Sequence, residues 1–300
     1  FTPVISTTLS KVMFMSENKM LVADSLQRIH SILDIKPLSN NENKVNIKDN
    51  SIELKNVKFK YENSKSNAID GISLKIKPNQ TVALVGPSGS GKSTLANLIS
   101  RFYDIDSGKI LIGNVNVKDI EKKELMNTIS FVFQNSKLLK TSIYENVKMA
   151  KPEATKVEVL HALHLAQCDD IIKKLPNGID TVIGTKGVYL SGGEEQRINI
   201  ARIMLKDSKV VILDEATAFA DPENEIQVQK AFEELSKNKT VIMIAHRLST
   251  IRNVDKIYVL NNGKIEEEGK HEELLKKNGL YKEMWDNYQT SISWKVGENV

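Results

Sequence analysis

The stretch from Gly86 to Thr94 reads Gly-Pro-Ser-Gly-Ser-Gly-Lys-Ser-Thr and decides the fold of this chain. Residues 81–85 precede it and have the β-branched, apolar content of a buried strand, whereas residues 95–102 have the apolar spacing of a helix. The glycines therefore lie in a turn from a strand to a helix. We expect the backbone N–H groups of this turn and the positive end of the helix dipole to form a cradle for an anion.

The residue types at the end of the loop indicate which anion it holds. The pattern G-x-x-x-x-G-K-[ST] is typical of loops that bind nucleotide phosphates. We expect Lys92 to reach the β- and γ-phosphates, Ser93 to bind Mg²⁺, and Thr94 to support the phosphates from the first helical turn. The rest of the expected phosphate contacts come from Gly86, Pro87, Ser88, Gly89, Ser90 and Gly91. The strand before and the helix after argue against the alternative, a flexible glycine loop with an unrelated lysine.

Composition limits the class of protein. The chain has 300 residues, of which 40% are hydrophobic and 27% charged, so it can bury a substantial core. Its net charge of +4 fits a polyanionic ligand or an anionic membrane face, and it lacks the clustered basic stripe of a nucleic-acid binder. Cys168 is the single cysteine, which favours a reducing compartment and a buried, apolar role. No segment reaches the roughly 20 apolar residues of a membrane span.

The first 45 residues are expected to lead into the main domain rather than to belong to it. Phe1 begins a half-apolar stretch that is not a signal peptide, and we interpret it as the cut end of something longer. Residues 16–33 carry apolar side chains at helical spacing, which predicts an amphipathic helix that Pro37 ends. A polar linker follows. We therefore expect a boundary near residue 45, a main domain over 46–290 and a short tail over the last ten residues.

The main domain has the pattern of an α/β protein. Residues 52–61 and 68–76 alternate apolar and polar side chains, which predicts two antiparallel strands beside the phosphate loop. Further short apolar runs occupy 110–113, 129–133, 210–214, 240–245 and 256–260. Several of them are apolar on both faces, as in a sheet that helices cover on both sides. Residues 136–205 break this rhythm with helical patterns, so we expect a helical insertion there and an amphipathic helix at the end of the domain.

Two carboxylates follow the strand predicted at 210–214. Asp214 is expected at the carboxyl edge of the sheet, where ligands of open α/β sheets bind, and there it can hold Mg²⁺ through water. Glu215 comes one residue later and is suited to polarise the water that attacks the γ-phosphate. An apolar strand that ends in Asp-Glu is common by itself. Its combination with the phosphate loop makes a catalytic role persuasive.

A second anion site is predicted at Ser191, Gly192 and Gly193. A helix pattern follows these residues, so free backbone N–H groups and a serine hydroxyl gather at a helix N-terminus. The plain alternative is a capped helix with Ser191 as its cap. However, this site lies in the helical insertion, whereas the phosphate loop lies in the α/β core. If both hold one nucleotide from opposite sides, the simplest arrangement uses two copies of the chain.

From about residue 50 to residue 285 the chain resembles the nucleotide-binding domain of an ATP-binding cassette (ABC) transporter of exporter type. The motifs that carry the resemblance are Tyr61, Walker A at 86–94, Gln134 of the Q-loop, the signature at 190–196, Asp214 and Glu215 of Walker B, the D-loop at 218–221, and the switch residue His246. The resemblance implies a P-loop NTPase with a RecA-like mixed sheet core, an antiparallel β-subdomain and an inserted α-helical subdomain. It further implies ATP and Mg²⁺ as cofactors, with residues 1–35 as the end of a membrane domain.

The resemblance also implies roles for the added motifs. Tyr61 stacks on adenine, Gln134 contacts Mg²⁺ or the attacking water, and His246 binds the γ-phosphate and orients Glu215. Asp221 lies in a turn that crosses toward the partner cassette. An ordinary strand aromatic, an exposed loop glutamine and a core histidine are the alternatives for Tyr61, Gln134 and His246.

Two motifs depart from the usual pattern. The signature reads Leu-Ser-Gly-Gly-Glu, with Glu194 in place of the familiar glutamine, and we expect little harm because this side chain need not touch phosphate. The D-loop reads Ala-Phe-Ala-Asp in place of Ser-Ala/Leu-Leu-Asp. This segment resembles the branch that includes exporter-type transporters linked to siderophores and iron. Cargo is not readable from it.

The expected partners are a second cassette, identical or different, and a transmembrane domain upstream of Phe1. This arrangement implies a location at the cytoplasmic face of a membrane, with no nucleic acid as partner. A soluble ABC-type ATPase that acts on DNA or ribosomes would need long coiled coils or two cassettes in one chain. An importer cassette would lack the leading helix, and a P-loop kinase would leave residues 190–197 without a task. A structural protein without turnover is disfavoured by the Asp214-Glu215 pair.

Overall fold

The structure is a computed structural model that describes residues 1–297 except 36, 42–44, 63, 134–136, 185–187, 215–221 and 246–247. Contacts between Cα atoms divide the chain into two compact units, Phe1–Ser39 and Asn40–Val300. Each unit is described by itself.

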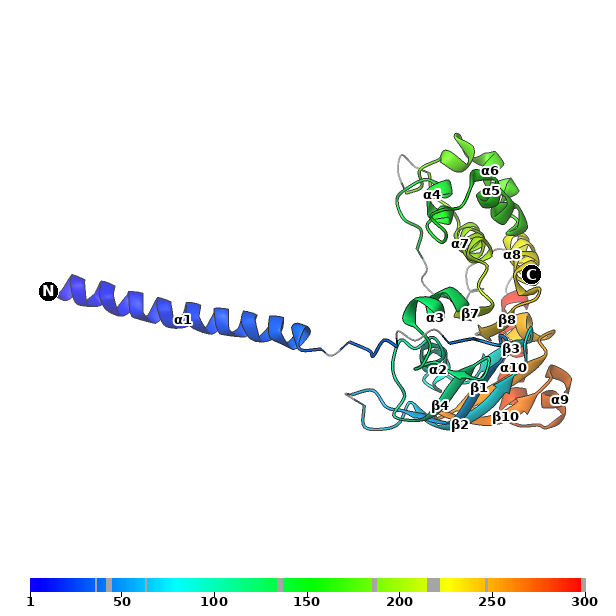
Figure 1. The fold of residues 1–300 in the computed structure, drawn as a ribbon, viewed down its shortest axis with the longest axis horizontal. Coiled ribbons are helices and arrows are strands. Elements are labelled where there is room, and N and C mark those ends of the chain that lie inside the picture. The colour runs from blue at the N-terminus through cyan, green and yellow to red at the C-terminus, as the bar shows by residue number, and fades with distance from the viewer. Residues whose placement is uncertain are drawn as a thin grey trace. The chain divides into compact units, whose positions relative to one another are not determined.

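The first unit is one helix, α1, which runs from Thr2 to Leu33 (Figure 1). Sequence periodicity predicted a helix only from residue 16. The earlier start has a local reason, because Pro3 lies in the first turn, where a missing N–H breaks no helical hydrogen bond. The described side chains of α1 are exposed. Within the described part of the chain, no helix combines the length and the apolar character needed to cross a bilayer.

A mixed sheet forms the centre of the second unit. Its strands, among the described residues, lie in the order β10-β9-β3-β8-β7-β6. Their bounds are β3 Thr81–Val85, β6 Ile129–Val132, β7 Val210–Asp214, β8 Thr240–Ile244, β9 Lys256–Asn261 and β10 Lys264–Gly269. All neighbouring strands pair in parallel except β10, which is antiparallel to β9. The phosphate loop therefore directly follows β3, a strand in the interior of the sheet.

Helices cover both faces of this sheet, as the doubly apolar strands predicted. Successive side chains of a strand point to opposite faces, and in β3 Val82 and Leu84 join one buried cluster while Ala83 and Val85 join another. The first cluster contains the apolar face of α2, which runs from Lys92 to Ile99. The second contains residues of the C-terminal helices. The strand that ends at Gly86 is thus held from both sides.

An antiparallel sheet completes the core around α2. Its strands lie in the order β2-β1-β4-β5, with bounds β1 Ile52–Phe59, β2 Ile69–Ile76, β4 Ser107–Ile112 and β5 Val115–Asn116. The predicted antiparallel pair is confirmed, since Ile52 pairs with Ile76 and Phe59 with Ile69. The buried residues of β1 and β2 belong to the same cluster as those of α2. This packing brings the end of β1 toward the phosphate loop.

The helices predicted between β6 and β7 are confirmed, and they share a buried cluster with α8 (Pro222–Ser236) and with one face of β6, β7 and β8. They are α4 Ile143–Lys148, α5 Lys156–Leu165, α6 Asp169–Lys174 and α7 Gly192–Lys206, with a short 3-10 helix at Gly178–Asp180 (green in Figure 1). A further short helix, α3 Lys122–Thr128, precedes β6. Cys168 is fully buried in the core of these helices, as expected, and burial raises the pKa of its thiol to about 12.

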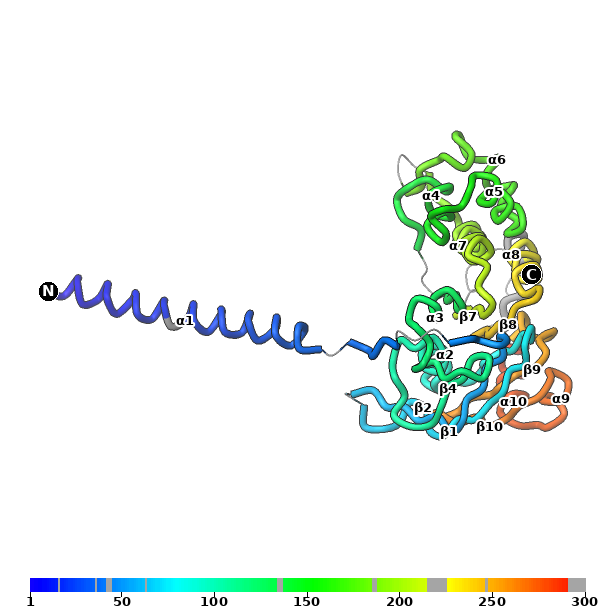
Figure 2. The backbone as a smooth tube through the Cα atoms, viewed as in Figure 1, coloured from blue at the N-terminus to red at the C-terminus, as the bar shows by residue number. Residues whose placement is uncertain are grey.

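The C-terminal part contains two elements that the sequence pattern did not resolve. The single closing helix expected there is two helices, α9 His271–Lys276 and α10 Leu280–Gly297, because Asn278 takes a left-handed φ of 51° between them (Figure 2). Glu266, Glu267 and Glu268, interpreted as a solvated face, lie in strand β10. The remaining elements are α8 Pro222–Ser236 and a 3-10 helix at Leu248–Ile251.

Candidate nucleotide-binding site

The phosphate loop joins β3 to α2, and its glycines are required by the space around them. Gly86 and Gly91 have φ angles of 149° and 102°. A Cβ atom on Gly86 would lie 2.0 Å from the carbonyl oxygen of Leu260, and one on Gly91 would lie 2.7 Å from that of Ala68. Both neighbours are backbone atoms, which cannot move aside. The loop can therefore adopt this close curve only with glycine at these two positions.

Lys92 begins α2 and turns its side chain into the loop. The residue is 5% exposed, and its Nζ donates hydrogen bonds to the carbonyl oxygens of Gly86 and Pro87, both at 2.9 Å. An ammonium group is thus held against the concave backbone where the sequence predicted the phosphates. Its positive charge adds to the N-terminal dipole of α2. The predicted phosphate loop therefore carries positive charge of its own.

A cavity of about 390 Å³ opens over this loop. It is lined by Tyr61, Ala68, Ser88, Gly89, Gly91, Lys92, Ser93 and Thr94. The ring of Tyr61 packs edge-on against Phe59 and Tyr103, with centroids 4.8 and 5.5 Å away. Its hydroxyl lies 3.2 Å from that of Thr94. The structure therefore brings the predicted adenine-stacking residue to the mouth of the phosphate loop, which residue spacing alone could not show.

The predicted second anion site is the N-terminus of α7. Ser191 is the N-cap, and its Oγ accepts a hydrogen bond from the N–H of Glu194 at 3.3 Å. In return, Oε2 of Glu194 accepts one from the N–H of Ser191 at 2.8 Å. Gly192 and Gly193 form the first turn between them, and Ser191 and Gly192 are exposed. Glu194, the departure from the usual signature, therefore completes a capping box that the pattern Ser-x-x-Glu could have revealed.

Asp214 ends β7 at the carboxyl edge of the sheet, as predicted. In the register of the sheet, Asp214 pairs with Ile244 of β8, and Ile244 pairs with Leu84 of β3. The carboxylate is thus two strand spacings, roughly 10 Å, from the strand that feeds the phosphate loop. Glu215, Gln134, His246 and Asp221 lie outside the described residues, so their predicted roles stay predictions.

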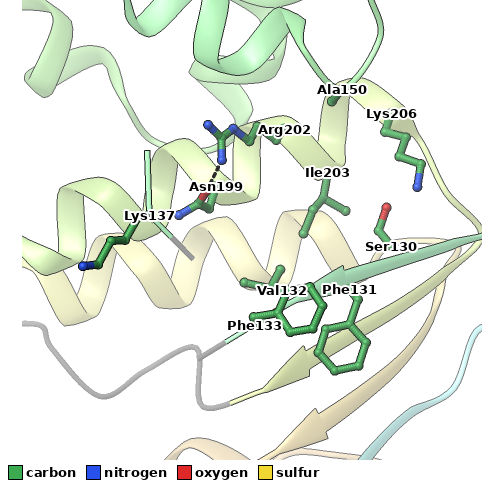
Figure 3. Close-up of a pocket in the computed structure, with 10 residues that line it drawn as sticks. All are labelled: Ser130, Phe131, Val132, Phe133, Lys137, Ala150, Asn199, Arg202, Ile203 and Lys206. Carbon is green, nitrogen blue, oxygen red and sulfur yellow. Dashed lines mark hydrogen bonds between the residues drawn. The ribbon is translucent and has the colours of Figure 1, made fainter. Parts of the chain in front are cut away.

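A second cavity, which the sequence did not reveal, lies between β6 and α7 and measures about 330 Å³ (Figure 3). Its lining includes Phe131 and Phe133 from one side and Arg202 and Lys206 from the other. Arg202 donates a hydrogen bond to Asn199 Oδ1 at 2.8 Å. The described lining contains cations and aromatic rings and no carboxylate. Phe133, which belongs to the lining, directly precedes Gln134.

The loop, the sheet that supports it and the inserted helices together define a nucleotide-binding P-loop domain of the cassette class. The sequence profile described as "ABC transporter" matches residues 69–218. The chain is 44% identical over 261 residues to the ATP-dependent lipid A-core flippase of Haemophilus influenzae (strain 86-028NP). The aligned region covers 86% of this chain and 44% of the flippase. The chain belongs to the ABC transporter family.

The three-dimensional structure is also similar to that of an ABC exporter. It resembles the solved structure of a bacterial Atm1-family ABC exporter with ATP bound, with a TM-score of 0.80 and 35% sequence identity. The match covers 87% of this chain and 46% of that one. The resemblance to exporter-type cassettes is therefore confirmed, and the chain spans less than half the length of either relative.

Proposed function

We propose that the chain is the ATP-binding and ATP-hydrolysing part of an exporter, and that two cassettes close around two Mg·ATP molecules. One contrast between the two predicted anion sites supports this proposal. Lys92 lies inside the phosphate loop, whereas Ser191 and Gly192 at the start of α7 are exposed. The exposed site is available to a nucleotide held by another copy.

The proposed chemistry assigns a separate role to each of the predicted site residues. Ser93, Asp214 and Gln134 hold Mg²⁺, which neutralises charge that develops on the phosphates when it is bound. Glu215 polarises the attacking water. His246 hydrogen-bonds the γ-phosphate and keeps Glu215 in place, and Asp221 contacts the partner cassette. Tyr61 binds the base.

We propose that the segment around Gln134 couples ATP hydrolysis to transport. It would contact a membrane domain from the cytoplasmic side of the membrane. The cavity lined by Phe131, Phe133 and Arg202 supports this route, because it offers apolar and positively charged surface next to that segment. The flippase and the Atm1-family exporter are both named as transporters, which also supports coupling to transport. Each is more than twice as long as the region that matches this chain. Neither name supports the alternative, an ATPase without a transport partner.

The test is the substitution Glu215→Gln. It keeps the shape of the side chain but removes the carboxylate, so ATP should still bind and hold two chains together while hydrolysis falls by at least ~100-fold, about 2.7 kcal/mol of barrier. Light scattering with and without Mg·ATP measures the dimer, and phosphate release measures turnover. Glu233→Gln, which changes an exposed glutamate of α8, is the matched control. Unimpaired turnover in Glu215→Gln would remove Glu215 from the mechanism.

A further inference from the structure

We propose that Arg197 and Asp170 form a positioning pair that aims the Ser191–Gly193 corner at the nucleotide of the second cassette. This inference rests on the proposed function, since it concerns how the exposed anion site of one chain meets the ATP of another. Arg197 follows Ser191 by six residues, roughly 9 Å along the axis of α7.

The contact is a two-pronged ion pair between α7 and α6. Nη1 of Arg197 lies 2.7 Å from Oδ1 of Asp170, and Nη2 lies 3.1 Å from Oδ2. Nη1 also donates to the carbonyl oxygen of Gln167. The Arg197 side chain is 1% exposed, whereas that of Asp170 is 46% exposed. A planar guanidinium bound at two points fixes direction as well as distance, so the pair sets the angle at which α7 leaves the α5–α6 corner.

The corner that receives Arg197 is shaped for this contact. Gln167, between α5 and α6, has a left-handed φ of 59°, a conformation that non-glycine residues adopt rarely. Its carbonyl oxygen then faces Arg197. Burial acts to raise the pKa of Asp170, but the hydrogen bonds and charge of Arg197 outweigh it, so that the pKa lies below its usual value. This direction favours the ionised carboxylate that the ion pair requires.

The other described contacts of the signature corner lack a two-point geometry toward another helix, although Leu190 packs against the buried cluster through apolar contact. The capping box between Ser191 and Glu194 closes within the helix itself, so it moves with the helix. The apolar residues of α7 further along, from Ile198 onward, pack in the helical core and fix the axis away from the corner. Burial of a guanidinium carries a desolvation penalty that an apolar side chain of the same volume does not have. The ion pair is therefore a poor way to increase the free energy of unfolding. Orientation of the corner is the role that its geometry serves.

The test separates positioning from stability with matched variants in the Glu215→Gln background. Arg197→Lys keeps the charge but loses the two-point contact, and Asp170→Asn keeps the size but loses the charge. Val159→Ala is the control, because Val159 is fully buried in α5 in the same helical core and lies outside the pair. For each variant, Tm, the ATP affinity of the dilute monomer and the ATP concentration for half-maximal dimer are measured.

We expect both pair variants to raise the ATP concentration for half-maximal dimer by about tenfold or more, while monomer affinity changes by less than about twofold. Val159→Ala should lower Tm, because it removes buried methyl groups, and leave dimer formation unchanged. If dimer loss follows Tm across all three variants, or if the pair variants dimerise like their parent, the inference is wrong. A Glu215→Gln parent that does not dimerise with ATP would instead contradict the proposed function on which the inference depends.

Discussion

The hydroxyl of Tyr61 lies 3.2 Å from the hydroxyl of Thr94, which joins the aromatic cluster at the end of β1 to the first turn of α2. Phe59 and Tyr103 make T-shaped contacts with the Tyr61 ring. These contacts and the hydroxyl contact hold the ring at the cavity over the phosphate loop. The predicted stacking of adenine on this ring can therefore be tested directly.

Substitution of Tyr61 should separate base binding from phosphate binding. Tyr61→Ala should weaken ATP binding by about 1–3 kcal/mol, the usual value of stacking one base on an aromatic ring. Tyr61→Phe keeps the ring, so it should retain most of the affinity. Isothermal titration calorimetry with ATP measures both, and inorganic triphosphate is the matched ligand because it has no base to stack. Equal losses for ATP and triphosphate would show that Tyr61 acts on the loop rather than on adenine.

Two glycines of the loop should respond differently to the same substitution. Gly89 has a φ of 78° and nothing within 4 Å of an added Cβ, so Gly89→Ala should cost only the left-handed conformation, about 1–2 kcal/mol of unfolding free energy. Gly86→Ala would also press a Cβ against the Leu260 carbonyl oxygen at 2.0 Å. The unfolding free energy of Gly86→Ala should therefore fall clearly further than that of Gly89→Ala. Urea unfolding measures both values, and equal losses would contradict the clash as the cause.

The sequence predicts those parts of this fold and site that depend on neighbours in the chain. The β3–loop–α2 unit follows from an apolar strand, three glycines and a helical pattern, and the position of Asp214 follows from the end of its strand. Contacts between distant residues did not appear in the pattern. Arg197 and Asp170 are 27 residues apart, and nothing local marks them as partners.

Sequence-based interpretation also missed features that depend on backbone geometry. Three consecutive glutamates look like a solvated face, yet they form β10 because its backbone pairs with β9 and its side chains alternate between half-buried and exposed. Asn278 and Gly279 form an Asn-Gly pair, a local signal for a helix end that the expectation of one closing helix did not use. The left-handed φ of Asn278 divides α9 from α10. Glu194 looked like a harmless substitution, and the structure gives it a capping role. In each of these cases backbone geometry decided the outcome.

The capping box of α5 should make stability depend on pH in the acid range. The pKa of Glu158 is lowered from 4.5 to about 2 by a hydrogen bond from Lys151 and by hydrogen bonds from the backbone and side chain of Thr155. Because the folded pKa lies below the unfolded one, the stabilisation is present above pH 4.5 and is lost as pH falls toward about 2.

Glu158→Gln removes this titration, so the Tm of the variant should fall less steeply than that of the parent across that window. Glu283→Gln, at an exposed glutamate in the first turn of α10, controls for the loss of one negative charge. NMR titration of the Glu158 carboxyl gives a direct check. A midpoint near 4.5 would show that the contacts of Thr155 and Lys151 do not hold the carboxylate in solution.

Mixing two defective chains should decide whether the nucleotide site spans two copies. Lys92→Ala removes the ammonium group from the phosphate loop, and Ser191→Arg blocks the exposed corner of α7. Each variant alone has two damaged sites in a dimer and should lose ATP hydrolysis, and Lys92→Ala should also bind ATP more weakly. In a mixed dimer one site combines both defects, while the other combines an intact loop with an intact corner. Hydrolysis should therefore return when the two inactive chains are mixed.

The recovery has a defined size and a defined control. Random pairing of equal amounts places half of the dimers in the mixed form, and each has one of two sites intact, so activity should return to at most roughly a quarter of the parent value. Mixing each inactive chain with more of itself controls for concentration. If each chain instead used its own loop and its own corner, no mixture would contain an intact site, and activity would stay at the level of the single variants. Recovery requires that Lys92 of one chain and Ser191 of another serve the same nucleotide.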